Sequence, residues 1–213
     1  MAIDTNRYKN IIFDLGGVIL NIDYSLTVKA FRDLGLNDFD TLFSQAQQKQ
    51  LFDLYEKGQI TSVDFRNEIK TYCKTTVDYT NINDAWNAML LDLPLPRLDI
   101  LKIMKQTHRT FLLSNTNEIH IDTFNDYLQT NFKIADLSGY FEKLYLSYKV
   151  GMRKPDAEIF ELLLEENNLT PDETLFIDDS MQHIESAQKL GIHTYWLDVK
   201  KESIVELFQL PTV

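Results

Sequence analysis

Three aspartates at the ends of two apolar runs are the side chains of this sequence best suited to chemistry. Asp14 interrupts the run IIFDLGGVIL and precedes a glycine pair, and Asp178 and Asp179 follow the run LFI. Neighbouring carboxylates at a buried site repel each other, which makes them costly unless a cation is present. Carboxylate oxygens are the ligands of small hard cations, which often accompany phosphate groups. The three aspartates therefore predict a site for a divalent cation and a phosphorylated ligand.

Two further polar stretches lie between these aspartates in the sequence. Ser114 and Asn115 follow the apolar run TFLL, and Lys154 lies within SYKVGMRKPD. Each has a common structural interpretation, since a serine often caps a helix and a lysine is usually exposed. Aspartates are likewise ordinary turn and helix-start residues. Together these polar stretches indicate a functional site more specifically than any one of them does, because a turn alone does not explain the adjacent acids.

The composition limits the partners of the chain. It has 213 residues, of which 32 are acidic and 21 basic, giving a net charge of −11. Nucleic acids and anionic membranes favour a basic surface, so neither is predicted as a partner. No run approaches the roughly 18 apolar residues of a membrane span, and the first residues do not resemble a secretory signal. Cys73 is the only cysteine, which fits a reducing cytoplasm, and no protein partner is indicated.

Five short apolar runs predict the strands that would position the polar stretches: Asn10–Phe13, Thr110–Leu113, Lys143–Leu146, Thr174–Ile177 and Thr194–Leu197. Amphipathic helical stretches lie between most of them, which predicts an α/β fold with a doubly wound parallel sheet. Ligands bind such sheets at the carboxyl ends of the strands. The polar stretches follow four of the five strands, and we therefore expect them to meet at this edge.

The interval between the first two strands is too long for one crossover helix. Residues from about Tyr24 to about Leu91 have the pattern of several helices, and Pro94 and Pro96 predict the return to the sheet. We expect a core domain of residues 1–22 and 92–213 and an inserted helical domain of residues 23–91. Large apolar side chains at helical spacing predict a separate core for the inserted domain: Phe31, Phe39, Phe43, Leu51, Phe52, Tyr55, Phe65, Tyr72 and Trp86.

The order of the motifs DxG, SN, GxRKP and DD resembles that of the haloacid dehalogenase-like superfamily of Mg²⁺-dependent phosphatases. The resemblance extends from Phe13 to Leu197 and implies a Rossmann-like core of subfamily I with a C1-type helical cap. Four segments are similar to the bacterial α-D-glucose-1-phosphate phosphatase branch: FDLGGVILNIDY, LLSNTNEIH, LYLSYKVGMRKPDAEIF and FIDDSMQHIESAQKLGI. The implied activity is Mg²⁺-dependent hydrolysis of a small phosphorylated metabolite, such as glucose 1-phosphate, by a cytoplasmic enzyme.

The resemblance implies which residues hold the metal. Asp14 would share Mg²⁺ with the backbone carbonyl of Gly16. Asp179 is the expected direct ligand and Asp178 the expected residue behind it, although the two roles could be exchanged. All of these groups offer oxygen, which suits Mg²⁺.

The resemblance also implies which residues act on the phosphoryl group. Asp14 would be the nucleophile and form an aspartyl-phosphate, which splits one difficult step into two. Ser114 and the backbone N–H of Asn115 would bind the phosphoryl oxygens. Lys154 would neutralise the nucleophile and the developing charge. Lys154 and Mg²⁺ would then be the local cations that an anionic substrate needs on so acidic a chain.

Gly16 departs from the family pattern. Most phosphatases of the superfamily carry a second aspartate there as general acid and base, a contribution of about 10²–10⁴-fold. One hypothesis is that good leaving groups, such as those of sugar 1-phosphates, are favoured; another is that Asp23 or a Mg²⁺-bound water substitutes. A haloacid dehalogenase-type hydrolase and a catalytically weak phosphate-binding module are the alternatives. The adjacent acids favour the phosphatase, because clustered carboxylates need a cation.

The inserted domain offers aromatic side chains for substrate contact. Trp86, Tyr24 and the turn at Tyr55–Gly58 are the candidates, with packing inside the domain as the alternative. His120 and His183 follow two of the motifs, but a histidine near a helix start is more often a cap or a surface residue. No catalytic histidine is therefore predicted.

Overall fold

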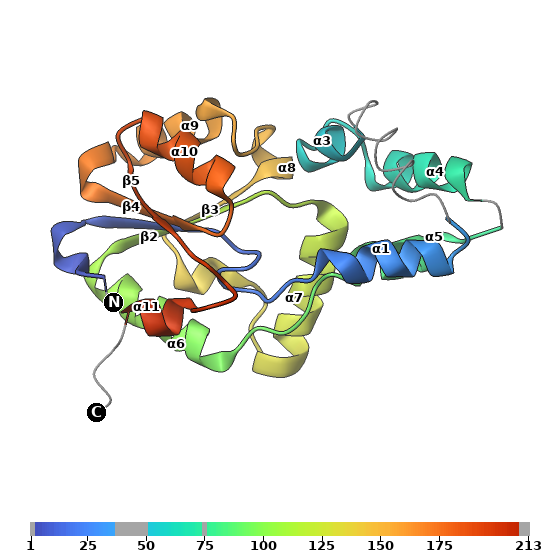
Figure 1. The fold of residues 1–213 in the computed structure, drawn as a ribbon, viewed down its shortest axis with the longest axis horizontal. Coiled ribbons are helices and arrows are strands. Elements are labelled where there is room, and N and C mark those ends of the chain that lie inside the picture. The colour runs from blue at the N-terminus through green and yellow to red at the C-terminus, as the bar shows by residue number, and fades with distance from the viewer. Residues whose placement is uncertain (1–2, 37–50, 74–75, 209–213) are drawn as a thin grey trace.

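The computed structural model describes residues 3–36, 51–73 and 76–208. Five parallel strands form one sheet in the order β3-β2-β1-β4-β5 (Figure 1). The crossovers on both sides of the central β1 confirm the doubly wound α/β fold. The strands are β1 (Asn10–Phe13), β2 (Arg109–Ser114), β3 (Lys143–Leu146), β4 (Thr174–Asp178) and β5 (His193–Trp196).

The strand boundaries differ from the predicted ones by one residue at several ends. β2 begins at Arg109 and ends on Ser114, and β4 continues to Asp178. Backbone pairing explains the longer strands, because Arg109 lies opposite Asn10 and Asp178 lies opposite Trp196 in the neighbouring strands. Two predicted site residues are therefore the last residues of strands, and the sheet itself fixes their positions.

Helices cover both faces of the sheet, because successive strand residues point to opposite sides. Ile11 and Phe13 of β1 belong to the hydrophobic cluster that includes α6, α7 and α11, whereas Ile12 belongs to the cluster with α9 and α10. Figure 1 shows these two helical layers above and below the strands. The elements outside the sheet are α6 (Leu95–Thr107), α7 (Glu118–Phe132), α8 (Ser147–Val150), α9 (Ala157–Asn167), α10 (Met181–Lys189), α11 (Ile204–Phe208), η1 (Thr5–Arg7), η2 (Leu137–Tyr140) and η3 (Pro171–Glu173).

A group of helices projects from one side of the sheet (Figure 1). We call the described residues between Asp23 and Leu91 the helical insertion. Side-chain caps begin three of its helices, at Asp23, Thr61 and Asp78, which satisfies backbone N–H groups that otherwise lack partners. The insertion comprises α1 (Tyr24–Asp33), α3 (Leu51–Glu56), α4 (Ser62–Tyr72) and α5 (Tyr79–Asn87).

The helical insertion has its own hydrophobic cluster. Phe65 lies at its centre, fully buried, and contacts the rings of Tyr55, Phe52 and Trp86 at centroid distances of 4.3, 6.1 and 5.1 Å. Ile119 of α7 joins this cluster from the sheet side. The aromatic side chains therefore pack inside the insertion as the helical spacing predicts; Phe39 and Phe43 lie outside the described residues.

The chain enters and leaves the helical insertion at one place. The backbone N–H of Asn21 donates to the carbonyl of Asp92, that of Leu91 donates to Asn21, and that of Asp23 donates to Met89, at 2.9–3.0 Å. The two crossings thus form a short antiparallel pair. The predicted domain boundaries, after residues 22 and 91, fall within it, whereas Pro94 already caps α6.

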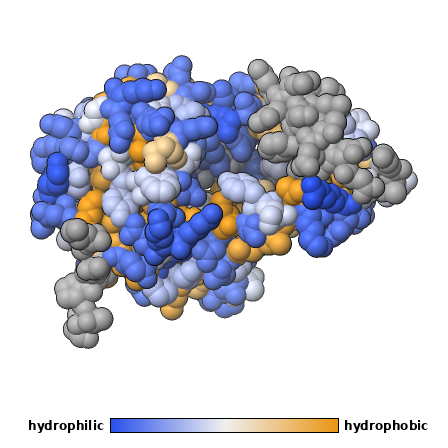
Figure 2. All heavy atoms as spheres, viewed as in Figure 1, coloured by the Kyte–Doolittle hydropathy of each residue, from blue (hydrophilic) through white to orange (hydrophobic). Residues whose placement is uncertain are grey.

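Hydrophilic side chains predominate on the face shown in Figure 2, as expected for a chain with a net charge of −11. Within the described ranges, no helix is both long and apolar enough to cross a bilayer.

Candidate active site

The side chain of Lys154 lies between two carboxylates at the carboxyl edge of the sheet. Its Nζ is 2.7 Å from Oδ1 of Asp14 and 2.7 Å from Oδ2 of Asp178. Lys154 and Asp178 are fully buried, and Asp14 is 8% exposed. Buried charges persist in proteins when they are paired, and here one cation pairs with the ends of both β1 and β4. The interpretation of Lys154 as a solvated surface residue is therefore wrong.

Two loops hold Lys154 in this position. The short helix α8 follows β3 and ends at Gly151, whose φ of 75° lies in the left-handed region that favours glycine. The backbone N–H of Lys154 donates to Oδ1 of Asn115 at 2.9 Å, and Nδ2 of Asn115 donates to the Lys154 carbonyl at 2.8 Å. The side chain of Asn115 thus fixes the loop after β3 against the end of β2.

Both carboxylate oxygens of Asp178 have partners within the protein. Oδ2 accepts from Lys154, Oδ1 accepts from the backbone N–H of Ser180 at 2.7 Å, and Nδ1 of His183 is 3.0 Å from each oxygen. Burial acts to raise the pKa of Asp178, but Lys154 and His183 outweigh it and lower that pKa. Asp178 is therefore held as a carboxylate, with little of it left to bind a ligand.

Asp179 lies over the glycine pair that follows Asp14. A Cβ at Gly17 would overlap the carboxylate of Asp179, and the φ of Gly17 is +80°, so a larger residue would be both crowded and strained. Burial raises the pKa of Asp179 to about 6, and the charge of Asp178 acts in the same direction. Burial likewise raises the pKa of Asp14 to about 7, with further contributions from the neighbouring acids.

These acids fit a hard divalent cation. One oxygen each from Asp14, Asp178 and Asp179 lies within 4.8 Å of the others. Three carboxylates converge here and Lys154 pairs with two of them, so this one cation does not offset the charge of all three. An all-oxygen set with excess negative charge is the kind of site that Mg²⁺ occupies.

Ser114 and Asn115 lie beside these acids, at the end of β2. Ser114 is buried, and among the described residues its Oγ makes one long hydrogen bond of 3.4 Å, to the carbonyl of Asn115. The next turn is fixed by Ser147, whose Oγ accepts from the Thr116 N–H and donates to the Thr116 carbonyl, both at 2.9 Å. Asn117 caps α7, so the interpretation of Ser114 as the helix cap is wrong.

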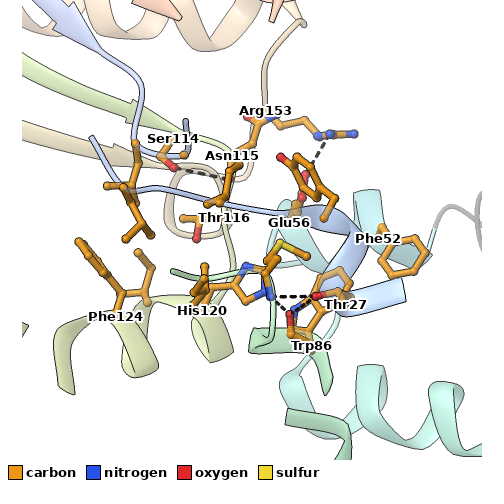
Figure 3. A pocket seen from close by; sticks show the side chains of 18 of the residues that line it. Thr27, Phe52, Glu56, Trp86, Ser114, Asn115, Thr116, His120, Phe124 and Arg153 are labelled. Atoms are coloured by element: carbon orange, nitrogen blue, oxygen red, sulfur yellow. Dashed lines mark hydrogen bonds and ion pairs between the residues drawn. The ribbon is translucent and has the colours of Figure 1, made fainter. Parts of the chain in front are cut away.

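A cavity of about 670 Å³ opens between these strand ends and the helical insertion. Figure 3 shows its lining side chains, with Ser114, Asn115 and Arg153 on the sheet side and Phe52 and Trp86 on the insertion side. Most of the insertion-side lining is apolar. The polar or charged members from the insertion are Tyr24, Thr27, Asp53 and Glu56.

The helical insertion is docked on the loops that carry the site. Arg153 pairs with Asp53 and, at 3.0 Å, with Glu56 of α3, and Lys57 is 2.9 Å from Asp156. A Cβ on Gly58 would overlap the carbonyl oxygen of Tyr148, and the φ of Gly58 is +63°. The turn after α3 can therefore approach α8 this closely only with glycine at position 58.

Several side chains that the sequence singles out have structural roles here. Oδ1 of Asp23 accepts from the N–H and the hydroxyl of Ser25, and these hydrogen bonds lower the pKa of Asp23. Because they favour the carboxylate, and because Asp23 does not line the cavity, the hypothesis that it is a substitute acid is not supported. Trp86 is 6% exposed and stacks on Phe52 and His120, so it belongs to the insertion's core as well as to the cavity wall.

Two features of the site were not predicted from the sequence. One is the contact of His183 with Asp178, which the first turn of α10 makes possible across only five residues. The other is the partly buried Glu56, which belongs to α3 and reaches the cavity from the helical insertion. Its only signal in the sequence was the Tyr55–Gly58 turn, named above as a candidate contact with substrate.

Comparisons with known proteins agree with this geometry. The family model of haloacid dehalogenase-like hydrolases matches residues 8–191. D-ribitol-5-phosphate phosphatase of Bacteroides thetaiotaomicron is 34% identical over 88% of this chain and 90% of its own. A haloacid dehalogenase family enzyme of the same organism, solved with magnesium and inorganic phosphate, has a TM-score of 0.83 at 37% identity, covering 94% of this chain and 99% of its own.

A further solved structure, a predicted hydrolase of this family from Porphyromonas gingivalis, has a TM-score of 0.84 at 30% identity, covering 97% of this chain and 99% of its own. These matches confirm the resemblance inferred from the motifs and the prediction of a phosphatase enzyme. Membership of the glucose 1-phosphate phosphatase branch stays a prediction. The chain belongs to the haloacid dehalogenase-like hydrolase family.

Proposed function

We propose that this enzyme hydrolyses a small phosphorylated sugar or polyol, with Mg²⁺ as cofactor and an aspartyl-phosphate at Asp14 as intermediate. One observation carries the proposal: the Asp14 carboxylate, paired with the fully buried Lys154, belongs to a cluster of three acids. Leu15 and Gly16, the two residues after Asp14, line the cavity of about 670 Å³. The magnesium and phosphate bound by a relative, and the polyol phosphate in another relative's name, support the same chemistry.

In this proposal each residue of the site has one task. The free oxygen of Asp14 attacks phosphorus in line with the leaving oxygen, while Lys154 holds the other oxygen through its 2.7 Å contact. Ser114 Oγ and the Asn115 N–H bind the phosphoryl oxygens and keep the group oriented. Lys154 offsets charge on Asp14, so that the anionic phosphate can approach.

The metal would be held by Asp14, Asp179 and the backbone carbonyl of Gly16. Asp178 would orient Lys154 rather than bind directly, because its oxygens are already engaged by Lys154, Ser180 and His183. When bound, Mg²⁺ would neutralise phosphoryl oxygens and bring the substrate to the nucleophile. We further propose that residues 23–91 act as a cap over a core of residues 1–22 and 92–213. Such a cap excludes water and selects the leaving group.

A screen of phosphorylated metabolites tests the proposed function. Pentitol 5-phosphates, hexose 1-phosphates and hexose 6-phosphates are incubated with the enzyme, with millimolar Mg²⁺ or with a chelator, and released phosphate is measured. We expect Mg²⁺-dependent release from at least one of these classes. Halide release from 2-haloacids without metal would instead favour a dehalogenase. Phosphate binding without turnover of any ester would favour a binding module.

Metal binding has a second readout, thermal stability. A ligand at about 100 times its Kd stabilises the folded state by about 2.7 kcal/mol, which corresponds to about 5–10 °C for a chain of this size. We expect Mg²⁺ to raise the Tm of the wild type by this amount and to have little effect on Asp179→Asn. The matched control is Asp172→Asn, an exposed acid of η3 outside the site, which should keep the full shift. An equal shift in all three proteins would place the metal elsewhere.

A further inference from the structure

The cavity has no acid at the position where the family usually supplies one. A Cβ on Gly16 would lie 3.0 Å from Cδ1 of Ile22, so an apolar side chain occupies the space next to this glycine. An alkoxide leaving group nevertheless needs a proton, and a positioned acid typically contributes about 10²–10⁴-fold. If alkyl phosphates are substrates, the proton has to come from another part of the molecule.

Four described side chains that line the cavity could in principle donate a proton: Tyr24, Asp53, Glu56 and His120. Both ring nitrogens of His120 are engaged, with Asn117 and the Trp86 carbonyl, and burial lowers its pKa to about 4. Partial burial and nearby carboxylates raise the pKa of Tyr24 to about 12. Neither pKa suits proton transfer near neutral pH.

The two acids of α3 differ in their surroundings. The side chain of Asp53 is 53% exposed and accepts a hydrogen bond from Nη1 of Arg153. The side chain of Glu56 is 21% exposed, and its Oε2 is buried without a hydrogen bond, although it lies 3.0 Å from Nη2 of Arg153. Figure 3 shows Arg153 and Glu56 facing each other at the cavity wall. Glu56 is thus a partly buried carboxyl group that lines the cavity, with one oxygen that makes no hydrogen bond to the described residues.

The charges around Glu56 allow it to exist as an acid. Burial raises its pKa, and so does the charge of Asp53, while Arg153 and the more distant Lys154 act to lower it. The net shift is upward, away from the ordinary range of an exposed glutamate and toward the working range of a general acid.

We propose that Glu56, delivered by the helical insertion, is the general acid and base of this hydrolase. The proposal rests on the proposed function and deepens it. In the first step Asp14 Oδ forms a bond to phosphorus, the bond to the leaving oxygen breaks, and that oxygen takes the proton of Glu56. In the second step water attacks the phosphorus of the aspartyl-phosphate, and the Glu56 carboxylate accepts its proton. Asp14 leaves as a carboxylate, phosphate is released, and Glu56 is again protonated.

Arg153 is the positioning residue in this arrangement. It is the neighbour of Lys154 in the sequence and pairs with both acids of α3. Its guanidinium therefore ties the proton donor of the insertion to the loop that places Lys154 beside the nucleophile. The acid and the nucleophile are brought together only when the insertion is docked.

The experiment compares Glu56→Gln with Asp53→Asn, which loses a charge on the same helix and the same partner. With the alkyl ester ribitol 5-phosphate, we expect kcat/KM of Glu56→Gln to fall by about 10²–10⁴-fold. With p-nitrophenyl phosphate, whose leaving group needs no proton, kcat/KM should remain within about tenfold. Since water attack is slowed, rapid mixing should show a burst of about one nitrophenolate per enzyme before slow turnover. Asp53→Asn should show neither the selective loss nor the burst.

The pH profile gives a further readout. Because Glu56 donates from its protonated form, kcat/KM of the wild type on the alkyl ester should fall as the pH rises through the pKa of Glu56. This limb should be absent in Glu56→Gln. In Asp53→Asn it should be retained but lie at lower pH, because the charge of Asp53 helps to raise the pKa of Glu56. Glu56→Asp, which restores a carboxyl group on a shorter chain, should recover part of the rate on the alkyl ester.

Other outcomes overturn the proposal. An equal loss on the alkyl and aryl esters without a burst would mean that Glu56 only docks the insertion. An increase in KM for the polyol ester alone would make Glu56 a hydroxyl-binding residue. Both outcomes leave the proposed function intact, whereas a wild type inactive on every ester with Mg²⁺ would refute the proposed function itself.

Discussion

Replacing Asp14 by asparagine is expected to lower kcat for phosphate release by at least about 10⁴-fold, because an amide oxygen cannot serve as the covalent nucleophile. The substitution removes one of the two carboxylates paired with Lys154, but the contact of Lys154 with Asp178 remains. The fold should therefore persist, and circular dichroism checks this. Steady-state phosphate release measures the loss.

A second measurement identifies the intermediate. Acid-quenched wild-type enzyme should carry a phosphoryl group on the peptide that contains Asp14, and the Asp14→Asn protein should carry none. Asp172→Asn, which lies outside the site, should behave as the wild type in both assays. Turnover by Asp14→Asn within tenfold of the wild type would mean that another residue is the nucleophile.

Replacing Lys154 by methionine is expected to have the largest effect on stability. Methionine fills similar space, but it leaves Asp14 and Asp178 facing each other without the cation that bridges them. Breaking a buried ion pair from one side typically costs about 3–5 kcal/mol in the free energy of unfolding, because the remaining charges are buried without a partner. Urea unfolding at neutral pH measures this cost, and phosphate release should be lost with it.

The pH dependence of this variant has a definite sign. Without Lys154, the folded-state pKa of Asp14, which is already raised, should rise further, and that of Asp178, which Lys154 helps to lower, should rise as well. Groups with raised folded-state pKa values destabilise the protein most at high pH, so the deficit should shrink as the pH falls through those values. The double variant Lys154→Met/Asp178→Asn should recover part of the stability. A deficit below about 1 kcal/mol would mean that the pair is exposed to water.

The strands and the site acids were predictable because both signals are local. A strand buried on both faces is a continuous apolar run, and Asp178 follows LFI without interruption. The exact ends of the strands were harder to predict, because backbone pairing and not hydropathy determines them. Arg109 is exposed and charged, so the apolar pattern begins after it, yet it pairs with Asn10 in β1.

The contacts of the helical insertion could not be predicted in the same way. Asp53 and Arg153 are 100 residues apart, and no local pattern specifies that α3 packs on the loop after β3. The role of Asp23, in contrast, depends on a local contact. It directly precedes α1 and has the residue type of a helix N-cap, so the local signal for its structural role was present in the sequence.

The backbone pairing between Asn21–Asp23 and Met89–Asp92 has a consequence for how the protein can change in evolution. Because the two crossings are neighbours, the intervening residues can be exchanged for a shorter or differently shaped segment without moving any strand. The acidic edge of the sheet would keep its geometry, while the residues that face it across the cavity would be replaced as a unit. Substrates can thus vary while the phosphoryl chemistry stays the same, because the insertion joins the sheet through one short antiparallel backbone pair.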